Sequence, residues 1–355
     1  MNFGGQELRI CTEMEGLRKY GIDSVLACRT GSKIADLADK RGLKYHEVPF
    51  RTSFDIFSIK KLIGLIKGYK IKIVNSHSSK DAWNSAIACK ITGASFVRSR
   101  HVGLKVRRHI PGRMIYTMFP KRVLVTGRYI EDMLINCGVQ PSKIMRIPTG
   151  VDIDRFTGQK NTLLKSQLGL KDNIFLVGFV SVVKSDKGPH YFVKSAPYIL
   201  RHLQDVRFVI VGDGNFLERV KLLVSELNLE EYFHFTGHRD DIESVLKGMD
   251  LFVLPAVKPE GIPQSLLQAF ASGLPVVATD IGGVNEVALH GKTAFVVKPR
   301  DAEGLAEAII YLKENQRIAA DLAEEGRKLA ASHSVEDMLQ KMKSFYDGIL
   351  GNGRS

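Results

Sequence analysis

Cysteine is scarce in this sequence, and long apolar runs are absent. The 355 residues include four cysteines, Cys11, Cys28, Cys89 and Cys137, and none of them belongs to a CxxC or CxxH pair. This spacing argues against structural zinc and favours reduced thiols. No apolar run approaches the roughly 20 residues of a membrane-spanning helix, and the N-terminus lacks the pattern of a secretory signal. We therefore expect a globular cytoplasmic protein.

Acidic residues are missing from a long stretch of the first half. Residues 82–130 contain ten Lys or Arg and no Asp or Glu. Residues 1–150 carry a net charge of +16 and residues 151–355 a net charge of −3. The first half therefore accounts for all of the positive net charge of the chain, which is +13. A field this one-sided predicts an anionic partner, namely nucleic acid, an acidic membrane surface or a phosphorylated substrate.

The segments that are present alternate between strand-like and helix-like patterns. Buried strands are predicted over residues 72–75, 95–98, 123–126, 174–182, 207–211, 251–255 and 275–279, and helices over 6–20, 56–70, 81–92, 188–203, 215–227, 242–249, 264–272 and 302–332. Strict alternation predicts parallel sheets with helices on both faces. A turn-rich boundary lies at 148–152. We expect an α/β fold of two doubly wound, Rossmann-like domains, 1–152 and 153–332, facing each other across a ligand cleft.

One strand expected at the start of the first domain is missing. Gly4 and Gly5 resemble the turn between a strand and its helix, yet only three residues precede them. A central strand usually has five or six residues. Either the chain is truncated or mis-started, or this domain is built differently, and we favour the first interpretation.

Two turns carry residues suited to phosphate. Gly4 and Gly5 open a helix, where glycine lets the backbone approach an anion and the helix N-terminus favours its charge. A turn without a ligand is an equally good interpretation. Lys184 and Lys187 lie between a strand and a helix and could hold the oxygens of a diphosphate. The alternative there is a solvated loop.

The richest stretch runs from residue 254 to residue 283. Pro263 suits the start of a helix, on which Gln264 and Gln268 share one face. The N-terminus of that helix offers unpaired N–H groups to an anion. Glu260 lies just ahead of it, at the mouth of the expected cleft. The combination of Pro, Gly and polar spacing favours a binding site over a solvated loop.

At this stretch the sequence resembles a known family, the retaining glycosyltransferases of family 4 (glycosyl transferases group 1). That family has the two-domain GT-B fold and includes bacterial enzymes of lipopolysaccharide and cell-surface polysaccharide synthesis. The resemblance covers residues 4–350 and rests on the order and spacing of several motifs. These are EGIP at 260–263, GLPVVAT at 273–279, GGVNE at 282–286, VGDG at 211–214, FTG at 235–237, KG at 187–188 and IPTGVD at 147–152.

The resemblance implies roles for residues of the second domain. Glu260 would face the donor sugar. Gln268, which stands where the family has a second Glu, would meet the ribose hydroxyls, because an amide can both donate and accept. Lys187 would bind the diphosphate, with Lys184 in place of the family's usual Arg. Further donor contacts would come from Gly4 and Gly5, from the backbone near Ile262, Gln264 and Ser265, and from a base pocket at His238 and Arg239.

In the first domain the resemblance points to a histidine near the transferred sugar. This is His101, which with Lys187 and Glu260 completes the implied catalytic set. His77 would line the acceptor side, together with Arg100, Arg107 and Arg108. Residues 333–355 would form a C-terminal helix that crosses back to the first domain, followed by a tail.

The implied reaction replaces the leaving group on the same face of the sugar, through an oxocarbenium-like state. The donor would be a nucleotide sugar, a UDP-sugar in preference to a GDP- or ADP-sugar, and neither a metal nor another cofactor is required. The basic first domain would bind an acidic glycan or lipid-linked acceptor. Its segment 109–123 mixes basic and apolar residues. This pattern fits peripheral association with an anionic membrane, on the inner face of the plasma membrane, and fits an ordinary buried helix with a solvated basic edge equally well.

Two other function classes stay open. Another GT-B enzyme, such as a nucleotide-sugar epimerase or an inverting heptosyltransferase, would share these motifs. A nucleic-acid-binding protein would use the same charge, but the sequence has no helix-turn-helix, RRM or zinc signature, so we expect no nucleic-acid partner.

Overall fold

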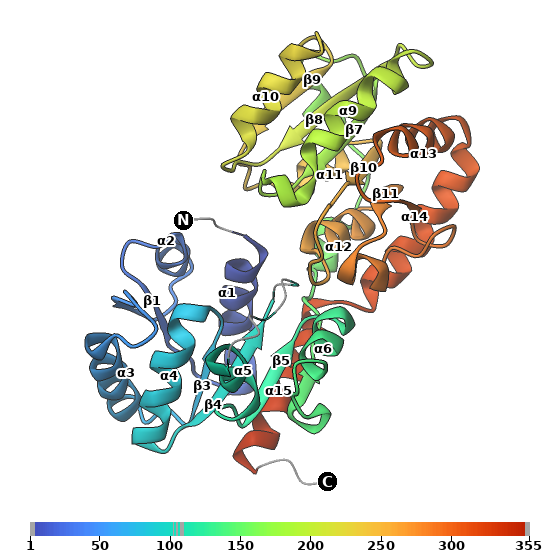
Figure 1. The fold of residues 1–355 in the computed structure, drawn as a ribbon. Coiled ribbons are helices and arrows are strands. Elements are labelled where there is room, and N and C mark those ends of the chain that lie inside the picture. The colour runs from blue at the N-terminus through green and yellow to red at the C-terminus, as the bar shows by residue number, and fades with distance from the viewer. Residues whose placement is uncertain (1–3, 102, 104–105, 107–109, 352–355) are drawn as a thin grey trace. The chain divides into compact units, whose positions relative to one another are not determined.

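The computed structural model describes residues 4–101, 103, 106 and 110–351 and divides into two compact units (Figure 1). Unit 1 comprises Met1–Gly150 and Glu336–Ser355, and unit 2 comprises Val151–Val335. The last helix, α15 (Val335–Leu350), therefore packs with the N-terminal half of the chain. One of its contacts is the hydroxyl of Tyr346, which accepts a hydrogen bond from the Asn75 amide at 3.1 Å.

The described strands of unit 1 form two separate parallel sheets. Their orders are β1-β2 and β3-β4-β5-β6. The strands are β1 (Leu26–Arg29), β2 (Tyr45–Val48), β3 (Ile73–Ser76), β4 (Ser95–Arg100), β5 (Arg122–Val125) and β6 (Ile144–Arg146). The helices are α1 (Gly5–Leu17), α2 (Lys33–Lys40), α3 (Ile56–Gly68), α4 (Ser79–Thr92), α5 (Ile110–Thr117), α6 (Arg128–Ile135) and α15, with 3-10 turns at Arg18–Tyr20 and Pro141–Lys143.

Unit 2 contains one parallel sheet of six strands in the order β12-β11-β10-β7-β8-β9. The strands are β7 (Phe175–Val180), β8 (Val206–Val211), β9 (Phe233–Gly237), β10 (Leu251–Leu254), β11 (Val276–Thr279) and β12 (Phe295–Val297). The helices are α7 (Ile153–Phe156), α8 (Leu163–Gln167), α9 (Pro189–Leu200), α10 (Leu217–Glu226), α11 (Ile242–Lys247), α12 (Gln264–Ala271), α13 (Ala302–Glu314) and α14 (Gln316–Ala331), with 3-10 turns at Ser185–Lys187 and Gly282–Glu286.

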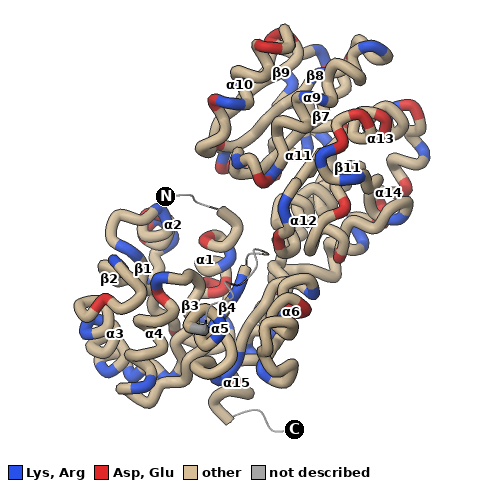
Figure 2. Tube along the Cα trace, in the orientation of Figure 1, with Lys and Arg blue, Asp and Glu red and all other residues tan. Residues whose placement is uncertain are grey.

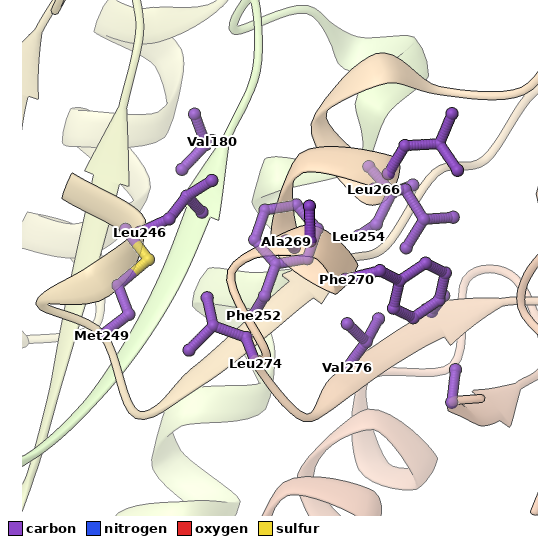
Figure 3. Packing of buried hydrophobic residues seen from close by; sticks show 14 of the residues in the cluster. Val180, Leu246, Met249, Phe252, Leu254, Leu266, Ala269, Phe270, Leu274 and Val276 are labelled. Atoms are coloured by element: carbon purple, nitrogen blue, oxygen red, sulfur yellow. The ribbon is translucent and has the colours of Figure 1, made fainter. Parts of the chain in front are cut away.

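The central strands of unit 2 are apolar on both faces because helices cover both faces. Every residue of β10 and β11 is buried. Figure 3 shows Leu266 and Phe270 of α12 packed with Phe252 and Leu254 of β10 and with Val276 of β11. This apolar face fixes α12 on the sheet and so sets where its N-terminus lies.

The expected helix over 302–332 is wrong as a single element. The structure has two helices there, α13 and α14, because Asn315 leaves the helical region with φ −110° and ψ 67°. Neither Pro nor Gly marks this break in the sequence.

Charge is distributed differently in the two units. Figure 2 shows Lys and Arg along α3, α4 and the neighbouring strands of unit 1, where acidic residues are few. Unit 2 carries both signs, interspersed along its helices. The positive field identified from the sequence is thus a property of unit 1.

Candidate active site

The candidate site of unit 2 lies where the order of its sheet reverses. β7 pairs with β8 on one side and with β10 on the other, so the connections that follow β7 and β10 diverge. In open parallel sheets a crevice forms at the carboxyl ends of such strands, and ligands bind there. The loops that leave these two strand ends are residues 181–188 and 255–263.

Lys187 and Glu260 bring these two loops together. The ammonium of Lys187 forms an ion pair with Oε2 of Glu260, and the two side chains are 24% and 20% exposed. The other carboxylate oxygen, Oε1, is buried and has no hydrogen-bond partner among the described residues. A buried acceptor without a donor is costly, so this oxygen is suited to receive a hydroxyl from a ligand.

Close backbone packing explains the glycines of both loops. A Cβ on Gly188, where φ is +70°, would lie 1.8 Å from the carbonyl oxygen of Pro255. Behind Glu260, the N–H of Gly283 donates to the Glu260 carbonyl at 2.8 Å, and a Cβ on Gly283 would lie 2.7 Å from the carbonyl carbon of Gly261. Only glycine fits these approaches. The glycines therefore hold Lys187 and Glu260 in place.

The start of α12 supplies amide groups next to Glu260. Pro263 is the N-cap and Gln264 the first helical residue, so the first N–H groups of the helix have no intrahelical partner. Oε1 of Gln264 is buried without a hydrogen-bond partner among the described residues. Gln268 lies one turn further on, and both glutamines are half-buried. Ile262 is buried and Ser265 half-buried at the same helix end.

The remaining residues of unit 2 that we predicted to bind the sugar donor differ in whether they already have hydrogen-bond partners. Lys184 is half-buried, and its ammonium has no side-chain partner among the described residues. After β9, the N–H of His238 donates to the Asp213 carboxylate at 3.2 Å. The guanidinium of Arg239 is bound by Asp241 at 2.6 Å, and this hydrogen bond lowers the pKa of the Asp241 carboxyl. Arg239 is thus already paired.

In unit 1, His77 and His101 meet at the ends of two adjacent strands. β3 pairs with β4 in parallel, so the residues that follow them lie side by side. Nδ1 of His77 and Nε2 of His101 are 2.9 Å apart, and the rings stack at 5.2 Å between centroids. The N–H of His77 also donates to Asp81, at the start of α4, at 3.2 Å.

Both imidazoles are held neutral. Burial lowers the pKa of His77 to about 3, with a further lowering by the positive charges of Arg98 and Arg9. Burial, then His77 and the same two arginines, lower the pKa of His101 well below its ordinary value. One neutral ring therefore donates its N–H to the other. This pair can donate and accept hydrogen bonds, but it adds no positive charge to the site.

Two arginines near these histidines were not singled out from the sequence. Arg9 is buried on α1, where it pairs with Glu13 at 2.6 Å and donates to the carbonyl of Ile147 at 2.9 Å. Arg98 is buried on β4 and donates to the carbonyl of Ser76 at 2.9 Å. The spacing of Arg9 and Glu13 by four residues on one helix was the available signal.

The other predicted residues of unit 1 are placed as follows. The guanidinium of Arg100 is buried against Tyr116, to whose hydroxyl it donates at 2.6 Å. The N–H of Gly4 donates to the Glu7 carboxylate at 3.0 Å, and Gly5 is the first residue of α1. The Glu7 carboxylate thus accepts the hydrogen bond of the Gly4 amide, which we expected to bind a phosphate. Arg107 and Arg108 lie outside the described residues.

Known families match both units. Residues 3–155 match the family described as Glycosyltransferase Family 4, and residues 160–329 match the family described as Glycosyl transferases group 1. The chain belongs to glycosyltransferase family 4. The resemblance found in the sequence is thereby confirmed, and the chain is a glycosyltransferase.

The known proteins that are similar to this glycosyltransferase include the following three. It is 27% identical to the UDP-Gal:alpha-D-GlcNAc-diphosphoundecaprenol alpha-1,3-galactosyltransferase of Escherichia coli, over 97% of this chain and 89% of the relative. It is 22% identical to a capsular polysaccharide biosynthesis glycosyltransferase of Staphylococcus aureus, over 95% and 93%. The crystal structure of Anabaena HepE in complex with UDP has a TM-score of 0.86 at 21% identity, covering 97% of this chain and 96% of that one. The last likeness confirms the GT-B fold with two Rossmann-like domains.

Proposed function

We propose that this glycosyltransferase transfers a hexosyl group, with retention of anomeric configuration, from a UDP-sugar to a lipid-linked acceptor of cell-envelope polysaccharide or lipopolysaccharide synthesis. The observation that carries the proposal is the Lys187–Glu260 pair at the point where the sheet order reverses. There a cation for a diphosphate lies next to a carboxylate, one oxygen of which has no partner in the described part of the chain and is suited to a sugar hydroxyl. The UDP-bound relative supports the choice of base.

In the proposed reaction, the bond between the anomeric carbon and the diphosphate oxygen breaks while the acceptor oxygen bonds to the same face of that carbon. The acceptor's proton passes to the departing diphosphate. Lys187, assisted by Lys184 and the first amides of α12, stabilises the negative charge that develops on the leaving group. Glu260 orients the sugar, and Gln268 holds the ribose. Neutral His101, positioned by His77, faces the transferred sugar and contributes a hydrogen bond.

The acceptor side is assigned to unit 1 because of its charge. The Escherichia coli relative is named for an acceptor carrying a diphosphate on a polyprenol. A diphosphate-lipid acceptor for this chain would explain the +16 of residues 1–150, since the donor diphosphate needs only local lysines of unit 2. Such an acceptor resides in a membrane, so we also propose a peripheral position on the inner face of the plasma membrane.

An exposed patch at the start of α3 is suited to that membrane. Phe54, Ile56 and Phe57 are 62%, 55% and 64% exposed, and the basic residues Arg51, Lys60 and Lys61 around them are exposed. The one acid among them, Asp55, is turned inward, where it accepts hydrogen bonds from the N–H of Phe57 and the hydroxyl of Ser58. Residues 51–61 therefore expose apolar and positive groups and no carboxylate, as an interfacial anchor does. No helix among the described residues is long and apolar enough to span a bilayer.

The segment predicted to be interfacial, 109–123, differs from this patch. His109 lies outside the described residues, and Ile115 and Tyr116 are buried in the core of unit 1. These two side chains are not available to a bilayer.

A thermal-shift series tests the donor proposal. UDP and UDP-sugars should raise the melting temperature of the chain more than GDP, ADP or their sugars do, because a ligand that binds only the native state stabilises it. Lys187→Ala should abolish most of that rise. A larger rise with GDP or ADP would overturn the choice of base, and no rise with any nucleotide would overturn the donor site.

A further inference from the structure

Arg98 is a buried cation of β4 that forms no ion pair among the residues that the structure describes. Its side chain donates instead to neutral oxygens. Nη1 donates to the carbonyls of Ser76 at 2.9 Å and Ser99 at 3.0 Å, and Nη2 donates to the hydroxyl of Tyr116 at 3.2 Å. Arg98 is 3% exposed, and its Nε has no hydrogen-bond partner in the described part of the chain. Burial of a charge without an opposite charge opposes folding, so stability alone does not explain an arginine at this position.

The two carbonyls that Arg98 binds lie at the ends of neighbouring strands. Ser76 is the last residue of β3 and directly precedes His77. Ser99 lies on β4, two positions before His101. Since β3 and β4 are parallel and pair with each other, one guanidinium holds both strand ends just ahead of the two histidines.

The contact between the histidines depends on the spacing of these strand ends. Nδ1 of His77 and Nε2 of His101 are 2.9 Å apart, and this is the one side-chain hydrogen bond of either ring among the described residues. A separation of about 3.6 Å no longer counts as a hydrogen bond, so a shift of about 1 Å between the two strand ends would break the contact. The orientation of the rings is therefore set by the backbone that Arg98 holds.

We propose that Arg98 is a positioning residue of the transfer reaction, whose guanidinium fixes the ends of β3 and β4 so that His77 holds the ring of His101 toward the sugar. This inference rests on the proposed role of His101. A planar guanidinium presents its donors in a fixed fork, and can bind two carbonyls and a phenol at once, whereas the ammonium of lysine is a point charge on a flexible stem. The ring of Tyr116, on α5, lies 5.3 Å from the guanidinium carbon and stabilises it in place.

The charged groups near the histidines come from β4, α1 and α4. Burial is the largest cause of the low pKa of both imidazoles, and the positive charges of Arg98 and Arg9 lower the pKa further. Arg9 is itself paired with Glu13 at 2.6 Å. On α4, Asp81 accepts the backbone N–H of His77 at 3.2 Å, and burial raises the pKa of its carboxyl. A lysine in place of Arg98 keeps the positive charge, and so separates the effect of position from the effect of charge.

NMR of the free chain with ¹⁵N-labelled histidine tests the positioning. In the parent chain two hydrogen-bonded rings should stay neutral down to about pH 5, and His77→Gln and His101→Gln assign their signals. Arg98→Lys should shift the Nδ1 signal of one ring and the Nε2 signal of the other, because the hydrogen bond between them is lost. Arg98→Gln should in addition raise the pKa of both imidazoles, since a positive charge is removed. Unshifted histidine signals in Arg98→Lys would overturn the proposal.

Steady-state kinetics of the same variants measure the consequence for transfer. Arg98→Lys should lower kcat at least about tenfold, since a displacement of about 1 Å can cost about 100-fold, and should change the donor KM less than about threefold. The matched control is Arg122→Lys, the same exchange at an exposed residue of the neighbouring strand β5, which should keep kcat within about twofold. A lower kcat with unshifted histidine signals would overturn the positioning role. Shifted signals with an unchanged kcat would overturn the role of His101 in transfer, and with it the role of Arg98.

A milder variant keeps the test open if Arg98→Lys does not fold. Tyr116→Phe removes one acceptor of the guanidinium and retains the aromatic ring beside it. It should shift the same two histidine signals by a smaller amount. Unchanged histidine signals in this variant would overturn the proposal. The NMR readouts need no turnover, so their failure is distinguishable from a failure of the proposed transfer reaction.

Discussion

Lys187 and Glu260, 73 positions apart in the sequence, form an ion pair between the loops that follow two neighbouring strands of unit 2. Each side chain is thus held by the other. In the proposed reaction the donor diphosphate competes for the Lys187 ammonium, and its binding leaves the Glu260 carboxylate to the sugar. In the proposed function the pair therefore joins recognition of the diphosphate and recognition of the sugar in one contact.

Removal of the Lys187 ammonium should impair sugar transfer. We expect Lys187→Ala to lower kcat/KM by about 10- to 100-fold, because a charge-assisted hydrogen bond to the leaving group contributes roughly 1.5–3 kcal/mol. The matched control is Lys258→Ala, which removes a neighbouring lysine whose 2.6 Å ion pair with Asp186 is exposed. Exposed pairs contribute about 0–1 kcal/mol, so this variant should lose less than about fivefold. Equal losses in steady-state kinetics would contradict the assignment of Lys187.

Gly188 should be far less tolerant of a side chain than a glycine with the same backbone angle elsewhere. Gly169 has φ +68° and open space around a Cβ, whereas Gly188 has φ +70° and the Pro255 carbonyl in the way. Gly169→Ala should cost about 1–2 kcal/mol from the left-handed conformation alone. Gly188→Ala should cost about 1–3 kcal/mol more, because the two loops must separate. Urea unfolding measures both, and similar losses would show that the loops are not tightly packed.

Stability should fall in acid because of the histidine pair. Burial keeps the pKa of His77 near 3 in the native state, below its ordinary value of about 6.5 in the unfolded chain. Below pH 6.5 the unfolded state therefore binds more protons, and the free energy of unfolding decreases by at most about 1.4 kcal/mol per pH unit for this group. His77→Gln should flatten this decrease between pH 6.5 and pH 4 in hydrogen exchange of unit 1.

The exposed His202→Gln serves as the control for that measurement. This variant should leave the pH dependence of hydrogen exchange in unit 1 as it is in the parent chain, since His202 lies in unit 2. An unchanged slope in His77→Gln would mean that the imidazole is not excluded from protonation by burial.

Membrane binding should depend on the patch at the start of α3. The double variant Phe54→Ser, Phe57→Ser should lower the partition coefficient onto anionic phosphatidylglycerol vesicles at least about tenfold, because a fully buried Phe contributes roughly 1.5–3 kcal/mol. Leu222→Ser, which alters a side chain of unit 2 that is 56% exposed, should leave flotation unchanged. Equal flotation of the parent chain with neutral and anionic vesicles at low salt would refute the membrane proposal.

The sequence predicts the buried centre of the fold better than its edges. Strands such as β7 and β10 are continuous apolar runs, because helices cover both of their faces. β1 and β12 are short and largely half-buried, so they carry no clear apolar pattern and were not predicted. The break at Asn315 has no local marker either. The packing of α13 and α14 determines where the helix breaks, and a local sequence pattern contains no information about this packing.

The same distinction applies to the site. The positions of Lys187, Glu260 and the start of α12 could be predicted because they lie in short motifs. The glycines and the proline of these motifs are required by the local conformation and packing of the backbone. Arg9 could not be identified in this way, because its burial depends on Ile147, 138 positions away. The contact of His77 with His101 likewise requires the pairing of β3 with β4. The roles of all these residues in transfer stay predictions until turnover is measured.

The configuration of the product's new glycosidic bond tests the proposed function most directly. The chain is incubated with an α-linked UDP-hexose and a soluble short-chain analogue of a diphosphate-linked N-acetylglucosamine, and the anomeric proton of the product is assigned by NMR. We expect an α-linked disaccharide together with release of UDP. A β-linked product would contradict retention, and an epimerised UDP-sugar formed without acceptor would contradict sugar transfer itself.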